Sequence, residues 1–353
     1  TIYQNREFNK IENQSSSDWL KKEIKELKNI KNLEIKTRTS VAAFHGYNYL
    51  LARENLTDHL VKKDKQGKIR QRLLKIRAKK VILATGALER PLIFNNNDRP
   101  GIMLSSAVKK YADFYGVVSG KKNVFFTNND SAYESAFCLH NKGIKVEAII
   151  DIRENSNSKI VKAVEKVGIK IYWSHTIVDT SGYKRLNSVS VMKLSNDGLS
   201  ITGNKTNISC DCLGVAGGWT PAVHLFTQSG GKLTFDENDK VFLPNKYPSE
   251  QLSVGSCNGD FKLKEIINNL SINLKQFLKI NETDFDNILI ENEEENSKRN
   301  IWLLPSDKPI GKTKPFVDYQ NDATAKDIKL ALREGFRSIE HVKRYTTTGM
   351  GTD

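Results

Sequence analysis

The sequence predicts an α/β protein whose core is a parallel sheet. Strand and helix patterns alternate from residue 106 to residue 173, which is typical of right-handed crossovers between parallel strands. Two later apolar strands, 213–216 and 252–254, each run into a glycine-containing turn. With 353 residues, the chain is long enough for two or three domains, each with a buried core.

The composition indicates a globular protein that does not span a membrane. Apolar residues make up 38% of the chain, and their longest runs are strand-sized, far short of the roughly 18 residues of a membrane span. The chain opens at Thr1 with no initiator Met and no signal-peptide pattern, so we expect an internal fragment. Four cysteines in a Lys-rich chain favour reduced thiols in the cytoplasm.

Positive charge is concentrated near the start of the chain. The formal net charge is +14, and residues 1–80 hold 20 Lys and Arg against 9 Asp and Glu. These cations are predicted to lie on an amphipathic helix and on strands that alternate lysine with apolar residues, without the aromatic interleaving of nucleic-acid modules. We therefore predict no nucleic-acid partner, and a basic face that is solvated or docks an acidic partner.

The elements follow from period and turn signals. Before the alternating block we expect, in order, a helix at 19–27, strands at 33–35, 39–44, 47–53 and 70–78, and a buried strand at 80–87. Within the block we expect helix 106–115, strand 123–126, helix 131–142, strand 146–150, helix 158–167 and strand 169–173. Beyond it we expect a meander at 176–208, the two strands with glycine turns, a core helix at 263–278, an acidic linker at 291–296 and a helical unit at 325–345.

A Rossmann-type dinucleotide unit is indicated by strand 123–126, the loop that follows it, helix 131–142 and strand 146–150 with Asp151 at its end. The glycines of that motif are missing, because Thr127 and Asn129 stand where the first two belong. An asparagine side chain would occupy the space of the pyrophosphate. We predict a Rossmann-shaped domain whose loop holds no second dinucleotide.

Other chemistry-bearing residues favour structural roles. Cys210-Asp211-Cys212 is a lone Cys-x-Cys without a second thiol pair, so we predict buried cysteines and no metal site. The histidines are scattered without metal-ligand spacing, and we predict no catalytic residue in the chain. Glu89 and Arg90 are expected to form an ion-pairing hinge rather than an acid/base pair.

Several longer motifs occur in a characteristic order. Ala-Thr-Gly-Ala-Leu-Glu-Arg-Pro stands at 84–91 and Gly-Gly-Trp-Thr-Pro at 217–221, and Gly-Ser-Cys-Asn-Gly at 255–259 leads into a helix. This set resembles the two-dinucleotide-domain flavoprotein reductases, whose N-terminal glycine-rich loop is not found here. The first motif resembles, more narrowly, the alpha subunits of the heterotetrameric sarcosine oxidase family. So do the motifs at 97–101, 127–133, 228–232, 316–322 and 340–347.

The resemblance implies the domain organisation. The expected fold class is α/β, with two Rossmann-like three-layer nucleotide-binding domains, one of them incomplete, plus a small C-terminal helical domain. The first domain would comprise 1–88 and 209–280, and the second, inserted domain 106–208. A linker at 281–315 and the helical domain at 316–353 would follow. Related amine and opine dehydrogenase subunits carry an iron-sulfur cluster in that last domain, but this sequence has no cysteine beyond Cys257, so the helical domain is expected to be cluster-less.

The function implied is that of an oxidoreductase complex. Such a complex demethylates sarcosine oxidatively to glycine, forms hydrogen peroxide and passes the one-carbon unit to tetrahydrofolate. The alpha subunit would bind NAD, FMN would lie at the interface with a beta subunit, and FAD and tetrahydrofolate would bind elsewhere in an assembly with beta, gamma and delta subunits. The fragment alone would be inactive. The alternatives are a related amine or opine dehydrogenase subunit, a stand-alone pyridine-nucleotide oxidoreductase and a non-enzymatic binding module.

Two sets of site residues follow from the fold that the resemblance implies. The NAD site would be lined by backbone and small side chains, with helix N–H groups facing the cofactor. The alternative is that these small residues serve only tight packing between strands. The members of the NAD site would be Val41, Ala42, Ala84, Thr85, Gly86, Gly255, Ser256, Phe261 and Leu263. The interface with the flavin-bearing partner would be formed by Thr127, Asn128, Asn129, Asp130 and Ser131.

Overall fold

The computed structural model describes residues 10–282, 288–290 and 298–351, which form two compact units. The first unit contains the described residues up to Leu88 and from Thr220 to Ile290, and the second contains the remainder. Two short strands, β7 (Ala87–Glu89) and β16 (Trp219–Pro221), span two of the three places where the chain passes from one unit to the other. The predicted acidic linker at 291–296 lies outside the described residues.

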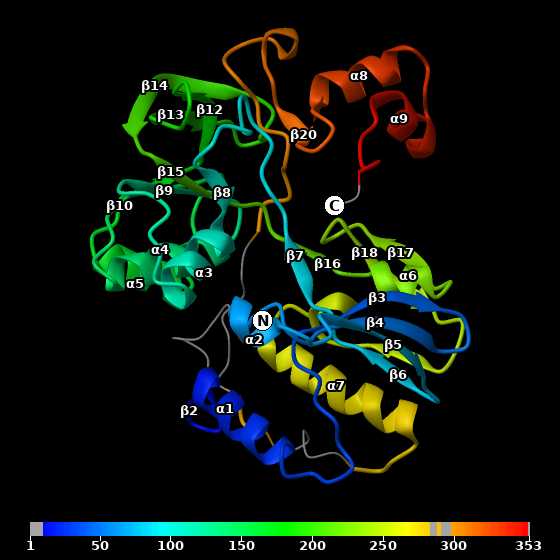
Figure 1. Ribbon diagram of the computed structural model, residues 1–353. Helices are drawn as coiled ribbons and strands as arrows, with labels where there is room; N and C mark the ends of the chain where they lie inside the picture. The colour runs from blue at the N-terminus through cyan, green and yellow to red at the C-terminus, as the bar shows by residue number, and fades with distance from the viewer. Residues whose placement is uncertain (1–9, 283–287, 291–297, 352–353) are drawn as a thin grey trace. The chain divides into compact units, whose positions relative to one another are not determined.

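The first unit combines an antiparallel meander with a parallel strand pair and flanking helices (Figure 1). The meander has the order β3-β4-β5, β6 pairs in parallel with β19, and β17 and β18 form a hairpin. The elements are β1 (Lys10–Ile11), β2 (Gln14–Ser15), α1 (Ser16–Leu27), β3 (Thr39–His45), β4 (Tyr49–Asn55), α2 (Lys62–Lys65), β5 (Gln71–Arg77), β6 (Val81–Leu83), α6 (His224–Gln228), β17 (Lys232–Asp236), β18 (Val241–Lys246), β19 (Gln251–Ser253), η1 (Gly255–Asn258) and α7 (Leu263–Leu278).

Two apolar clusters hold the first unit together. In one, Phe44 from β3 and Leu50 from β4 pack with Val81 and Leu83 of β6. The other cluster joins α1 to α7 through Trp19, Leu263 and Ile267, together with Ile11. One cluster anchors β6, which precedes the first of two loops at the site described below. The other anchors the start of α7, which follows the loop after β19.

The second unit is built on a five-stranded parallel sheet with the order β11-β10-β9-β15-β8. The predicted strands 123–126 and 146–150 are parallel neighbours, as expected. The elements are β8 (Ile102–Leu104), α3 (Ser105–Phe114), β9 (Asn123–Thr127), α4 (Ser131–Asn141), β10 (Val146–Asp151), α5 (Lys159–Lys166), β11 (Ile171–Trp173), β12 (His175–Ser181), β13 (Ser188–Leu194), β14 (Ile201–Ser209), β15 (Cys212–Ala216), η3 (Ile310–Lys312), β20 (Phe316–Asp318), β21 (Ala323–Thr324), α8 (Ala325–Arg333) and α9 (Ile339–Thr346).

The second unit has three layers. Helices α3, α4 and α5 cover one face of the parallel sheet, and the meander β12-β13-β14 covers the other (Figure 1). Along β9, whose residues are all buried, side chains alternate between the two faces, so that Val124 and Phe126 join the core shared with Val189 and Val191 of the meander. The predicted fold class, α/β with Rossmann-like three-layer architecture and C-terminal helices, is confirmed.

Several details differ from the sequence-based expectations. Residues 33–35 form no strand. The hairpin β17–β18 was not anticipated. Strand β15, expected in the first domain, lies in the sheet of the second unit, because its backbone pairs in parallel with β9 on one side and β8 on the other.

Among the described residues no helix is both long enough and apolar enough to cross a bilayer.

Candidate functional site

The first candidate site lies where β6 and β19 end. These strands run in parallel with Leu83 opposite Ser253, so the two loops that follow leave the same edge of the sheet side by side. A hydrogen bond of 2.9 Å from the Val254 amide to the Leu83 carbonyl continues the pairing into these loops. The structure therefore brings together two predicted groups of NAD-site residues, Ala84–Gly86 and Gly255–Ser256.

The backbone at this edge is open. Gly86 has φ +75° and Gly255 has φ +69°, a left-handed conformation that favours glycine. A Cβ built on Gly86 would meet no atom within 4 Å, and both Ala84 and Thr85 are exposed. An incoming ligand could therefore approach the main chain closely at Gly86.

Helix α7 follows η1 along the chain and packs against it. Its N-terminal boundary residue, Lys262, makes no side-chain capping hydrogen bond, and the positive end of a helix dipole favours an anion. The side chain of Leu263 is 2% exposed and packs in the α1–α7 cluster, so this residue can contribute only its backbone. Phe261 is half-buried immediately before the helix.

Val41 and Ala42 belong to a different sheet of the same unit. They lie on β3, where a bulge between Val41 and Ala43 interrupts the pairing with β4. Helix α6 packs on β3, and just ahead of α6 the Ala222 amide donates to the Gly86 carbonyl at 2.9 Å. The Thr85 hydroxyl donates to the Ala222 carbonyl at 2.8 Å. Val41 and Ala42 are thus connected to the glycine loop through α6 and the residues just ahead of it.

The second candidate site is the end of β9, at the place where a Rossmann unit binds phosphate. Thr127 lies level with Asp151 of β10 and Ala216 of β15. The Asn129 side-chain oxygen accepts from the Ser131 amide at 2.9 Å and from the Ser131 hydroxyl at 2.6 Å. The amide at the start of α4 is therefore already satisfied by the protein itself, as expected for a loop with asparagine in place of glycine.

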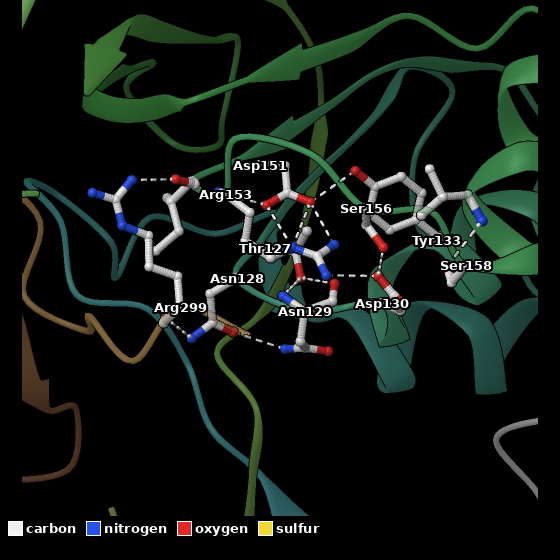
Figure 2. A network of polar contacts seen from close by, with 12 residues as sticks. Thr127, Asn128, Asn129, Asp130, Tyr133, Asp151, Arg153, Ser156, Ser158 and Arg299 are labelled. Carbon is white, nitrogen blue, oxygen red and sulfur yellow. Dashed lines mark hydrogen bonds and ion pairs between the residues drawn. The ribbon is translucent and has the colours of Figure 1, made fainter. Parts of the chain in front are cut away.

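A buried ionic cluster fills the space beside this loop (Figure 2). Arg153 is bidentate to Asp151, with Nη2 to Oδ2 at 2.7 Å and Nε to Oδ1 at 3.1 Å, and its Nη1 lies 2.7 Å from Asp130 Oδ1. The Tyr133 hydroxyl donates to Asp151 Oδ2 at 2.7 Å. Burial raises the pKa of Tyr133, which keeps this hydroxyl protonated. Asp151 is 0% exposed, so no carboxylate remains for a ribose.

A distant segment of the same unit closes the edge of the sheet. The Arg299 amide donates to the Asn128 carbonyl, and Asn128 Nδ2 donates to the Arg299 carbonyl at 3.0 Å. The Arg299 guanidinium donates to the carbonyls of Ile152 at 2.7 Å and Ser195 at 3.0 Å. Trp302 Nε1 donates to the Gly217 carbonyl at 2.6 Å. The end of β9, where a Rossmann unit would receive a dinucleotide, is thus hydrogen-bonded to a distant segment of the protein's own chain.

The predicted interface residues are therefore mostly turned inward. Thr127, Asn128, Asn129 and Asp130 are at most 6% exposed, and Ser131 is half-buried. A partner that meets this loop would contact Ser131 first. The interface role of the five residues stays a prediction.

Glu89 and Arg90, the residues of the expected ion-pairing hinge, each contact a group of the second unit. Glu89 Oε2 accepts from the Ser106 amide at 2.9 Å, at the start of α3. The Arg90 guanidinium lies over the Trp302 ring, 4.2 Å from its centroid. Burial raises the pKa of Glu89 to about 7, although hydrogen bonds from Ser106 oppose this shift.

The cysteines are buried, as predicted. Cys138, Cys210, Cys212 and Cys257 are all free thiols, and burial raises the pKa of Cys210 and Cys212 to about 12. No group of His, Cys, Asp and Glu side chains suited to a metal ion occurs in the part of the chain that the structure describes.

Sequence reasoning missed three residues of the closed second site: Arg153, Arg299 and Trp302. An Asp-x-Arg pattern at the end of β10 was a usable signal for Arg153, since two residues apart the side chains can meet once the strand has ended. Arg299 and Trp302 lie more than 80 residues along the chain from their partners, Asn128 and Gly217, so no local sequence pattern could have found them.

Comparison with solved structures defines the class of fold. The fold is similar to that of L-proline dehydrogenase from P. horikoshii, with a TM-score of 0.64 and 19% identity, over 99% of this chain and 62% of that one. T. acidophilum thioredoxin reductase follows with a TM-score of 0.50 and 16% identity, over 71% of this chain and 76% of that one. The chain thus shares the α/β fold of these two structures.

Sequence comparison is more specific. The chain is 34% identical to sarcosine oxidase subunit alpha of Corynebacterium sp. (strain P-1), over 97% of its own length and 36% of the relative. It is 31% identical to the same subunit of Rhizobium meliloti (strain 1021), over 97% of its length and 33% of that relative. Residues 312–353 match the family model of the sarcosine oxidase A3 domain. The chain is homologous to sarcosine oxidase alpha subunits over nearly all its length, and it spans about a third of theirs.

Proposed function

We propose that the chain is the NAD-binding portion of the alpha subunit of a sarcosine oxidase complex. The observation that carries this proposal is the 31–34% identity to such subunits over 97% of the chain. The reaction would be the oxidative demethylation of sarcosine to glycine with formation of hydrogen peroxide. The one-carbon unit would pass to tetrahydrofolate.

NAD would bind at the edge formed by β6 and β19 in the first unit. Gly86 leaves room for close approach to the main chain, and the positive end of the α7 dipole would favour a pyrophosphate. When bound, NAD would supply a hydride acceptor. The chain's own residues would bind and orient it: Ala84, Thr85, Gly86, Gly255 and Ser256 through backbone and small side chains. Phe261 and the amide of Leu263 would complete the wall, with Val41 and Ala42 at the adenine end.

The remaining cofactors would belong to the assembled complex. FMN would lie between this subunit and a beta subunit, while FAD and tetrahydrofolate would bind elsewhere, with gamma and delta subunits completing the assembly. The closed second unit supports a single dinucleotide site in this chain, because Asn129 and the Asp151–Arg153 pair already satisfy the groups that a second dinucleotide would need.

The test uses two matched glycines of the first unit. Gly86 and Gly67 both have positive φ, +75° and +71°, and a Cβ on either meets no atom within 4 Å. Gly86→Leu and Gly67→Leu therefore carry similar backbone strain, but only the first would obstruct the proposed site. We expect calorimetric titration of the full alpha subunit with NAD to show at least a tenfold weaker affinity for Gly86→Leu and no change for Gly67→Leu.

Two results would contradict the proposal. If both variants bind NAD as the unsubstituted subunit does, the site lies elsewhere. If the assembled complex containing the unsubstituted subunit consumes no oxygen with sarcosine but oxidises a different secondary amine, the alternative of a related amine dehydrogenase gains over the proposed activity.

A further inference from the structure

An exposed aromatic surface lies at the C-terminal end of α3 in the second unit. Five large apolar side chains within eight residues are 44–64% exposed. We call them the α3-end patch: Tyr111, Phe114, Tyr115, Val117 and Val118. Single exposed apolar residues are common on proteins, but a contiguous group of this kind marks an interaction surface.

The patch is preformed rather than loose. Tyr115 contacts both Phe114, with ring centroids 4.9 Å apart in an edge-to-face arrangement, and Tyr111, with centroids 5.9 Å apart. The helix is terminated by Gly116 with φ +66°, and the Val117 amide donates to the Tyr111 carbonyl at 2.9 Å. Because the rings are already packed against each other, a partner would immobilise few rotatable groups on binding.

The charge beside the patch is positive. Lys110 lies one turn before Phe114 on the same helix face, and Lys121 and Lys122 follow Val118; all three are exposed. The carboxylates in the vicinity are engaged, since Asp113 lies 3.2 Å from Lys142 and Asp211 accepts from the amides of Lys121 and Lys122. An apolar centre with a lysine rim is complementary to an apolar surface bordered by Asp and Glu.

We infer that the α3-end patch is a docking surface for another protein chain whose contact region is apolar and edged with carboxylates. Aromatic side chains are enriched at the centres of protein interfaces, and charge at the rim accelerates association. A second copy of this chain is a poor occupant, because two identical patches would bring lysine rims together. A nucleic acid is also disfavoured, because Val117 and Val118 offer no ring on which bases stack.

The experiment uses the natural full-length protein purified with its bound subunits. A photo-reactive phenylalanine analogue is placed at Phe114 and, as a matched control, at Tyr183, which is 92% exposed in the same unit but stands alone. We expect Phe114 to cross-link to a different polypeptide, at a segment rich in Asp and Glu that mass spectrometry identifies, and Tyr183 to give no such product.

A second measurement does not depend on cross-linking. The double change Phe114→Ser and Tyr115→Ser should weaken affinity for the cross-linked subunit by roughly 30-fold or more, as expected for truncation of a central aromatic, while Tyr183→Ser leaves it unchanged. The midpoint of thermal unfolding should stay the same in both variants, because these side chains are exposed. The inference is overturned if the cross-link joins two copies of this chain, reaches another part of the same polypeptide or a nucleic acid, or is absent while the double variant binds normally.

Discussion

The buried carboxyl of Glu89 makes the stability of the second unit depend on pH. The side chain is 8% exposed, and while Oε2 accepts from the Ser106 amide, Oε1 has no hydrogen-bond partner among the described residues. Burial raises the pKa from its ordinary value of 4.5 to about 7. Burial disfavours the charged form, so the folded protein holds the Glu89 proton more tightly than the unfolded chain does.

The sign and size of the effect follow from this difference in proton affinity. Below pH 4.5 Glu89 is neutral in both states and its favourable contribution is fully present; from there to about pH 7 only the unfolded chain releases the proton, so stability falls as pH rises. Above pH 7 the loss is complete at about 3 kcal/mol, the free energy that corresponds to a pKa change from 4.5 to about 7. The change Glu89→Gln keeps an acceptor for Ser106 and removes the titration. It should therefore stabilise the unit at pH 8 by about 3 kcal/mol and leave it within about 1 kcal/mol of the unsubstituted protein at pH 4.5.

Hydrogen exchange followed by mass spectrometry is the suitable assay, because two units need not unfold together. Protection of peptides from β9 and β15, corrected for intrinsic exchange, reports opening of the second unit at each pH. Glu165→Gln is the matched control, since it removes an exposed carboxyl of the same unit and should change nothing. Equal pH slopes for Glu89→Gln and the unsubstituted protein between pH 4.5 and 8 would show that Glu89 ionises freely in the folded state and would refute the argument.

Two further predictions concern the interior of the second unit. Asp151→Ala should destabilise the unit by about 3–5 kcal/mol, because it leaves the 4%-exposed Arg153 with a single carboxylate. Hydrogen-exchange protection measures the loss, and Asp98→Ala, at an exposed site, is the control. A loss of stability below about 1 kcal/mol would contradict the prediction. Cys210 and Cys212, whose pKa values burial raises to about 12, should resist alkylation by iodoacetamide at pH 8 until the protein unfolds; peptide mapping that finds them modified in the native protein as fast as in urea would disprove their burial.

The order of elements could be predicted from the sequence because most signals for it are local. The apolar periodicity correctly predicts strand β9, helix α4 and strand β10. The two strands pair in parallel, as expected. The placement of β15 in the second sheet could not be predicted, because a buried apolar strand fits either sheet equally well and its neighbours are set by long-range pairing. The hairpin β17–β18 was missed although Leu233 and Phe235 alternate with polar residues in β17, and Pro244 within β18 is an unfavourable residue for a strand.

The candidate sites were predictable to different degrees. The loops after β6 and β19 are recognisable from their small residues, and parallel pairing then brings them together. For the second unit, the missing glycines predicted only that the loop after β9 would not bind a dinucleotide. What satisfies the loop instead depends on Arg153 and on a segment around Arg299 that is distant in sequence, and such non-local hydrogen bonds leave no periodic signal.

The contrast between the two sheet edges supports the proposal that this chain holds a single dinucleotide. At the end of β6, glycine at positive φ leaves the main chain open, and the helix start at α7 has no side-chain cap. At the end of β9 the comparable groups are satisfied internally, because Asn129 binds the first amide of α4 and Arg153 neutralises Asp151. Reopening the second edge would require replacing the asparagine and also removing Arg153 and displacing the Arg299 segment. A single substitution to glycine at Asn129 should therefore leave an uncapped helix and a closed crevice, and not a second nucleotide site.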